Sequence, residues 1–144
     1  MKVKDCMCSQ VVCAKPNTTI QDVAKQMQTA HVGCMPVCND QNQIVGLVTD
    51  RDIILRCVAC DKEAKQTPVS EVMTTNVYTV SPEDTVEQAE KYMCECQVKR
   101  IPVVEQGTIK GIITLGDLAR NPQVTDATVG NTAKNICEGH KNEE

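Results

Sequence analysis

Apolar residues follow helical and strand spacing in turn along this chain, and the same order of patterns occurs twice. In the first occurrence a short apolar run precedes a helix-periodic segment, two further short runs and a second helix-periodic segment. Pro16 breaks the first run, and Thr18 or Thr19 can cap the helix that follows. The predicted elements are a strand over 11–14, a helix from Thr18 or Thr19 to about Ala30, strands over 35–38 and 44–48, and a helix over 50–58.

The second occurrence repeats this β-α-β-β-α order, with predicted elements over 77–80, 85–96, 101–105, 109–114 and 115–120. Strands this short suit a small sheet that helices cover on one side. Neither repeat alone buries both faces of its elements, so we expect the two to pack around a pseudo-two-fold axis. The predicted fold class is α/β.

The two occurrences are an internal repeat. Matching residues lie 66 positions apart until the polar turn 39–43, and 65 positions apart after it, so one residue is lost in a turn, where chain length costs little. The matches include Met7/Met73, Pro16/Pro82, Thr19/Thr85, Met27/Met93, Val32/Val98, Pro36/Pro102, Gly46/Gly111, Thr49/Thr114 and Asp52/Asp117.

These boundaries divide the chain into a first repeat over 1–60, a polar linker over 61–69, a second repeat over 70–121 and a tail over 122–144. In the tail, Val129, Ala133 and Ile136 recur at helical spacing together with Cys137, which predicts a partly helical tail. The last residues, 138–144, are expected to fray.

Composition narrows the class of protein. The net charge of −4 argues against binding of nucleic acid or of an anionic membrane surface, since both need a basic face. No apolar stretch approaches the roughly 20 residues that span a bilayer, and the first residues do not resemble a signal peptide. We therefore expect a soluble, cytoplasmic protein.

The pattern Gly-x-x-Thr-x-x-Asp occurs over 46–52 and 111–117, where a predicted strand meets a predicted helix. A helix start offers N–H groups and partial positive charge to an anion such as phosphate, and the threonine adds a hydroxyl. An aspartate one turn later can accept the hydrogen bonds of a ribose diol. Together these groups indicate a ribonucleotide site. Thr and Asp are also ordinary capping residues, each worth about 1 kcal/mol, and that interpretation stays open.

Together with KDCMC and SEVMT at the starts of the repeats and CMPV and RIPV at their second strands, the two motifs resemble those of a tandem pair of CBS (cystathionine-β-synthase) domains, a Bateman module. The resemblance covers roughly 1–121. The ending LGDLARNP also resembles that of small bacterial stand-alone CBS-pair proteins. It implies a regulatory ligand, namely AMP, ADP, ATP, S-adenosylmethionine or a related compound, with threonine facing phosphate and aspartate facing ribose. It also implies a homodimer and an unknown effector protein. Whether Mg²⁺ assists is open.

In this family a site commonly combines the Thr–Asp motif of one repeat with strands of the other. One predicted cleft then holds three cations and an aromatic ring, and the other holds no Arg or Lys, with His31 alone able to supply charge. We therefore expect one strong polyphosphate site and one weak, empty or adenosine-like site. The first cleft comprises Thr49, Arg51, Asp52, Tyr78, Thr79, Lys99, Arg100, Ile101 and Pro102, and the second comprises Thr114, Asp117, Cys13, Met35 and Pro36.

Ten cysteines leave alternatives open. Cys6, Cys8, Cys13 and Cys38 align with small or apolar residues of the other repeat, which favours small buried hydrophobes. A redox or metal sensor built on pairs such as Cys57/Cys60 or Cys94/Cys96 is the main alternative, although the zinc-ligand spacing is poor and no metal site is predicted. A structural dimerisation module with vestigial sites is the other. No motif for nucleophilic catalysis occurs, so we do not expect an enzyme.

Overall fold

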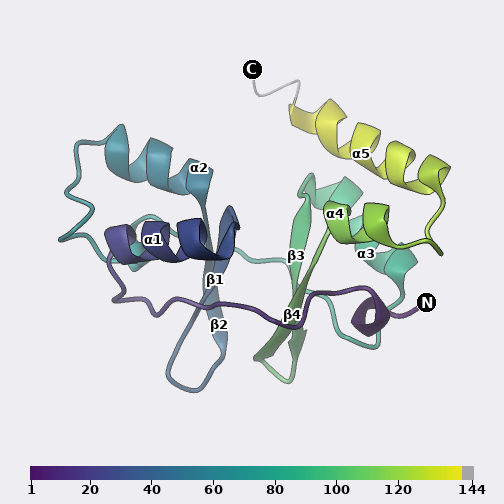
Figure 1. Cartoon of the computed structure of the whole chain (residues 1–144), viewed down its shortest axis with the longest axis horizontal. Coiled ribbons are helices and arrows are strands. Elements are labelled where there is room, and N and C mark those ends of the chain that lie inside the picture. The colour runs from purple at the N-terminus through teal and green to yellow at the C-terminus, as the bar shows by residue number, and fades with distance from the viewer. Residues whose placement is uncertain (141–144) are drawn as a thin grey trace. The chain divides into compact units, whose positions relative to one another are not determined.

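The computed structural model describes residues 1–140, so residues 141–144 of the expected frayed end lie outside the described residues. Figure 1 shows the elements in chain order. The regular elements are a 3-10 turn at Val3–Asp5, α1 (Ile20–Ala30), β1 (Cys34–Cys38), β2 (Ile44–Thr49), α2 (Asp50–Ile53) with a π-helical continuation at Ile54–Val58, a 3-10 turn at Val69–Glu71, α3 (Val86–Cys96), β3 (Arg100–Glu105), β4 (Thr108–Thr114), α4 (Leu115–Arg120) and α5 (Asp126–His140).

The predicted strands over 11–14 and 77–80 are wrong as strands. Only one residue of each segment pairs, Ala14 with Val37 and Val80 with Val103, both in parallel. Ala14 donates its N–H to the Pro36 carbonyl and accepts from Cys38, at 2.9 and 2.8 Å. The chain must then turn, because a proline that has no N–H to donate follows two residues after each bridge.

Threonine caps start the long helices where the sequence places them. Thr19 Oγ1 accepts the N–H of Asp22 at 3.2 Å, and Thr85 forms a reciprocal capping box with Gln88. Both helices end at a residue in the left-handed region, His31 and Gln97, each with φ 56°. The predicted mixed α/β class, with small two-stranded sheets and helices, is confirmed.

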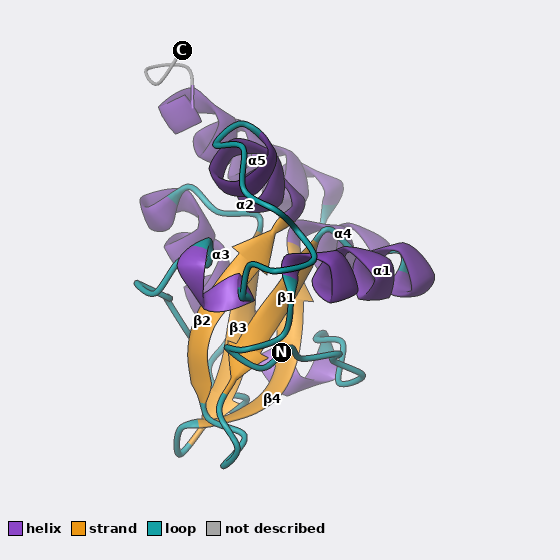
Figure 2. Ribbon diagram, turned by 90° about the vertical axis from the view of Figure 1, so that its left-hand side faces the viewer, coloured by secondary structure: helices purple, strands orange, loops and turns teal. Residues whose placement is uncertain are grey.

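The two hairpins, whose strands Figure 2 draws in orange, differ in the turn where the repeats differ in length. In the first hairpin the Asn39 side chain accepts N–H groups from Gln41 and Gln43, and the β1–β2 register shifts between Val37 and Cys38. The second turn needs only Gln106 and Gly107, whose φ values of 51° and 81° fit a type I′ turn. The extra residue of the first repeat is therefore absorbed in its turn.

The chain divides into two compact units that do not follow the sequence repeats. The first-repeat unit comprises 11–77 and 107–109, and the second-repeat unit comprises, among the described residues, 1–10, 78–106 and 110–140. Each unit thus holds the lead segment of the other repeat, the stretch before that repeat's first long helix, which is 1–10 in the second-repeat unit and 61–77 in the first-repeat unit. Val3 donates its N–H to the Asp84 carbonyl, and Val69 donates to Thr18, both at 2.8 Å.

Each unit has its own apolar core. Ile136 of α5 is fully buried in the core of the second-repeat unit, where α5 packs on α3 and α4 (Figure 1). Within residues 1–140, no helix covers the first-repeat unit in the way that α5 covers α3 and α4. The segment after α2 leaves Ile54, Leu55 and Val58 exposed. Burial of each large apolar side chain contributes about 1.5–3 kcal/mol. The core clusters are Val3, Val80, Val86, Ala89, Met93, Ile101, Val103, Ile113, Leu118 and Ile136 in one unit, and Ala14, Ile20, Val23, Met27, Met35, Val37, Val48, Cys57, Val69 and Val72 in the other.

The motif glycines make room for the lead segments. A Cβ at Gly46 would lie 2.5 Å from Met73 Sδ, and a Cβ at Gly111 would lie 2.6 Å from the Cys8 carbonyl oxygen and 2.8 Å from Met7 Sδ. Cys8 and Ile112 exchange both backbone hydrogen bonds here, so that carbonyl is held in place. The glycine of each motif is thus required by close packing of protein on protein.

We predict that Gly111→Ala destabilises the protein by roughly 1–3 kcal/mol, the usual cost of overpacking, and that Gly46→Ala costs clearly less. The reason is that the added methyl meets a fixed carbonyl in one case and the end of a flexible methionine in the other. Urea unfolding of both variants measures the difference. Equal losses of unfolding free energy would contradict this account.

Candidate ligand site at the two Thr–Asp motifs

Both motif threonines stand at a junction between strand and helix. Thr49 is the last residue of β2 and the N-cap of α2, and Thr114 is the last residue of β4 and the N-cap of α4. Each has extended backbone angles, with φ −114° and −122°, so the strand geometry continues up to the first helical residue. The junction therefore fixes where the helix begins.

Each threonine and its aspartate form a reciprocal capping box. Thr49 donates its N–H to Asp52 Oδ2 at 2.9 Å and accepts from the Asp52 N–H at 3.1 Å, and the pair Thr114/Asp117 repeats this at 2.9 and 3.0 Å. The capping interpretation is thus correct for both pairs. One oxygen of each carboxylate is used in the cap, and Oδ1 is the oxygen that remains for other partners.

The other oxygen, Oδ1, faces an arginine that the sequence analysis missed. Asp117 Oδ1 accepts from Arg120 Nη2 at 2.7 Å, whereas Asp52 Oδ1 lies 4.0 Å from Arg56 Nε. The expectation that Thr114 and Asp117 have no Arg or Lys beside them is therefore wrong. The signal was present, because residues three or four apart on a helix are neighbours.

A backbone hydrogen bond joins the first residue of each helix, α2 or α4, to the residue just before β1 or β3. Asp50 donates to the Gly33 carbonyl at 2.9 Å, and Leu115 donates to the Lys99 carbonyl at 2.8 Å. A Cβ at Gly33 would lie 2.8 Å from Asp50 Oδ2, the end of an exposed side chain, whereas the second repeat has Lys99 at this position. Gly33 thus lets the Asp50 side chain lie close to the backbone that leads into β1.

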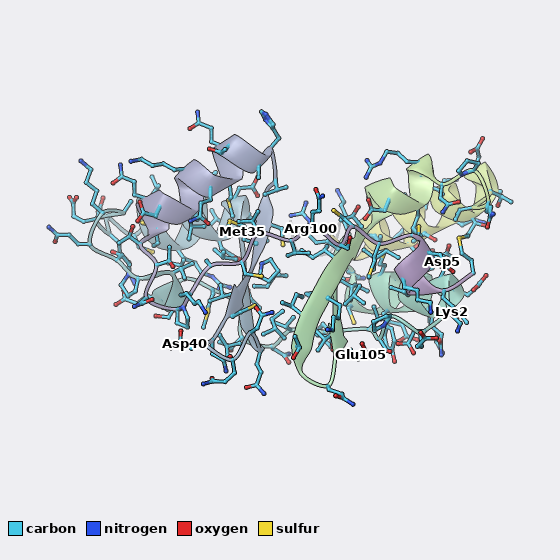
Figure 3. All side chains as sticks on the ribbon, turned by 60° about the horizontal axis from the view of Figure 1, so that its bottom comes forward. Lys2, Asp5, Met35, Asp40, Arg100 and Glu105 are labelled. Carbon is cyan, nitrogen blue, oxygen red and sulfur yellow. The ribbon has the colours of Figure 1, made fainter. Side chains whose placement is uncertain are left out.

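The remaining predicted site residues divide into exposed and buried groups. Met35 on β1 and Ile101 on β3 belong to the apolar cores, and Arg100 begins β3 (Figure 3). Pro36 and Pro102 are buried, and their carbonyls accept from Ala14 and Val80. The predicted pairing of each motif with strands of the other repeat involves both compact units and stays a prediction. The exposed members are Arg51, Tyr78, Thr79 and Lys99, and Thr49, Asp52, Arg100, Thr114, Asp117 and Cys13 are half-buried.

The cysteines are free thiols that differ in burial. Of the four expected to be buried, Cys38 is buried and Cys8 is exposed, so the expectation is wrong for Cys8. Burial and a hydrogen bond with Cys13 raise the pKa of the Cys38 thiol to about 12. Cys57 is buried and bonds the Lys62 carbonyl, whereas its predicted companion Cys60 is exposed and bonds the Leu55 carbonyl. Each of these two thiols thus donates a hydrogen bond to a different backbone carbonyl.

No cluster of three or more His, Cys, Asp or Glu residues close enough to hold a metal ion occurs within the described part of the chain. Over the same residues, none of the helices is both long enough and apolar enough to cross a membrane.

Comparison with known proteins agrees with the repeat. The family model described as "CBS domain" matches residues 3–58 and 69–123. The CBS domain-containing protein YhcV of Bacillus subtilis (strain 168) is 42% identical over 140 residues, which are 97% of this chain and 96% of that protein.

Three solved structures share the fold. A crystal structure of Hypoxic Response Protein I with two coordinated zinc ions has a TM-score of 0.78 at 28% identity. The matched region covers 84% of this chain and 98% of the chain in that structure. The CBS domain pair of protein MJ0100, in complex with 5-methylthioadenosine and S-adenosyl-L-methionine, has a TM-score of 0.75 at 26% identity, with 83% and 94% covered. CBSX2 in complex with AMP has a TM-score of 0.72 at 27% identity, with 83% and 93% covered.

We predict that a maleimide at pH 7 labels Cys8, Cys60 and Cys137 first and leaves Cys38 unlabelled in the folded protein. The thiolate is the reactive form, and a raised pKa keeps Cys38 protonated far above neutral pH. Mass spectrometry of peptides after timed labelling measures the order, and denatured protein, in which all ten should react, is the control. Labelling of Cys38 as fast as Cys8 would overturn the prediction.

Proposed function

The chain belongs to the CBS-domain family, and on that premise we propose that it is a regulatory module that binds adenosyl nucleotides at its Thr–Asp motifs. The observation that carries the proposal is that both repeats build the same capped junction, in which a threonine hydroxyl and a carboxylate oxygen lie side by side at a helix start. Two solved relatives of similar fold are in complex with adenosyl compounds, which supports the same ligand class here.

The chemistry of the junction suits such a ligand. A threonine hydroxyl that accepts the aspartate N–H can still donate its own proton to a phosphate oxygen. The carboxylate oxygen Oδ1 can accept hydrogen bonds from a ribose diol. We propose Asp52 and Asp117 as the ribose contacts and Thr49 and Thr114 as the phosphate contacts. The nucleotide acts as a regulatory ligand, and no cofactor is required.

We further propose that the output is regulatory and not catalytic. A bound nucleotide shifts the protein between two states only by binding one of them more tightly. A homodimer or a separate effector protein in the cytoplasm then responds to the favoured state. The exposed apolar side chains Ile54, Leu55 and Val58 after α2 support a protein–protein contact, since exposed apolar patches often mark one.

Two other functions each have one observation in their favour. Both capping boxes are formed by the protein's own atoms, which is the structural role that these residues would keep in a dimerisation module with vestigial sites. The contact between the Cys13 and Cys38 thiols is what a redox sensor would use.

The test is a thermal-shift series with AMP, ADP, ATP, S-adenosylmethionine and GTP, each with and without Mg²⁺. A ligand at about 100 times its dissociation constant stabilises the protein by roughly 2.7 kcal/mol, enough to raise the melting temperature by about 5 °C or more. We expect such a rise with adenine compounds and not with GTP.

The matched variants are Asp52→Asn and Asp117→Asn, because asparagine keeps an oxygen for the cap whereas alanine would remove half of the capping box. Each variant is expected to fold and to lose the rise that its own site contributes. No shift with any adenine compound in the wild-type chain would reject nucleotide sensing and favour the vestigial module. A melting temperature that instead follows oxidation of the thiols would favour the redox sensor.

A further inference from the structure

Both carboxylate oxygens of Asp117 have partners within the protein. Oδ2 accepts the N–H of Thr114 at 2.9 Å, and Oδ1 accepts from Arg120 Nη2 at 2.7 Å. The Asp117 side chain is only 12% exposed, whereas that of Arg120 is 73% exposed. A ribose hydroxyl that needs Asp117 Oδ1 must therefore displace the guanidinium, and the guanidinium is the partner that can move.

The guanidinium already lies over the motif. A Cβ at Gly116 would be 3.2 Å from Arg120 Nη1, 3.7 Å from its Nη2 and 3.5 Å from Thr114 Oγ1. Arg120 and the threonine hydroxyl therefore border the same small space, which exists because residue 116 has no side chain. A guanidinium released from Asp117 needs only a short movement to reach an anion bound at Thr114.

The first repeat arranges its charges differently. Its residue at the position of Gly116 is Arg51, which is exposed. Leu55 aligns with Arg120, and the arginine near Asp52 is the next residue, Arg56, whose Nη1 donates to the Val72 carbonyl at 3.1 Å and lies 3.5 Å from the Met73 carbonyl. Arg56 is thus anchored to the backbone, and its Nε stands 4.0 Å from Asp52 Oδ1, beyond hydrogen-bond distance. Only in the second repeat does an arginine hold the ribose carboxylate.

We propose that Arg120 makes the second-repeat site selective for adenosyl ligands that carry a phosphate. In the structure it holds Asp117 Oδ1, and on ligand binding it passes from the carboxylate to the ligand phosphate while Oδ1 passes to the ribose. A phosphate-free adenosyl compound must break the same ion pair and gives the guanidinium nothing in return. A ligand with a positive charge at the 5′ side is disfavoured further by repulsion. This inference rests on the proposed nucleotide function.

The experiment compares AMP with adenosine by isothermal titration calorimetry in the Asp52→Asn background, which weakens the first-repeat site. With Arg120 present, AMP should bind at least tenfold more tightly than adenosine. Arg120→Gln should weaken AMP binding roughly tenfold, the equivalent of about 1.4 kcal/mol, and should leave adenosine binding unchanged or slightly tighter. Arg120→Lys, which keeps the charge but not the planar fork, should recover part of the AMP affinity.

Lys134→Gln is the matched control, because it removes the same charge from the exposed surface of α5. It should leave both dissociation constants unchanged. An AMP-to-adenosine ratio that is the same with and without Arg120 overturns the inference, as does a lack of AMP binding in the Asp52→Asn background. In those cases, AMP binding to the wild-type chain still supports the proposed function. If neither ligand binds the wild-type chain, the proposed function fails and the inference fails with it.

Discussion

The reciprocal capping box between threonine and aspartate is the interaction on which each repeat depends. It ends a strand and starts a helix within one residue, because the threonine keeps extended angles while its oxygen receives the N–H of the third helical residue. It also orients the carboxylate, since one oxygen is held by the threonine N–H and the other is turned outward. A stabilising contact worth about 1 kcal/mol thus also prepares the group that we propose binds ribose.

The same strands that carry these caps also hold the lead segments. Gly46 and Gly111 lie three residues before the capping threonines, and each packs against the segment that leads into the other repeat. The cap and the glycine contact therefore share one short strand. Each lead segment is also covalently continuous with the repeat that it precedes, so each compact unit contains chain from both repeats.

Much of the fold could be predicted because the signals are local. Thr19 and Thr85 predict where their helices begin, and the polar turn 39–43 correctly separates the two predicted strands that form β1 and β2. The prediction of strands over 11–14 and 77–80 is wrong, because an apolar run of this length can also form a single β-bridge before a turn. The exchange of lead segments could not be predicted, since an offset between repeats shows which residues correspond but not which copy they pack on.

The charges at the motifs show a related limit of comparing aligned positions. At position 116 the second repeat has glycine where the first has Arg51, and this comparison alone indicates a site without cations. The structure instead shows that the missing side chain leaves space for Arg120, which comes from the next turn of the same helix. A side chain at 116 would come within 3.2 Å of Arg120 Nη1, so it would share the space that the guanidinium borders. The difference between the repeats then lies in the surroundings of each carboxylate, with an anchored guanidinium 4.0 Å from Asp52 Oδ1 and a direct, exposed ion pair at Asp117.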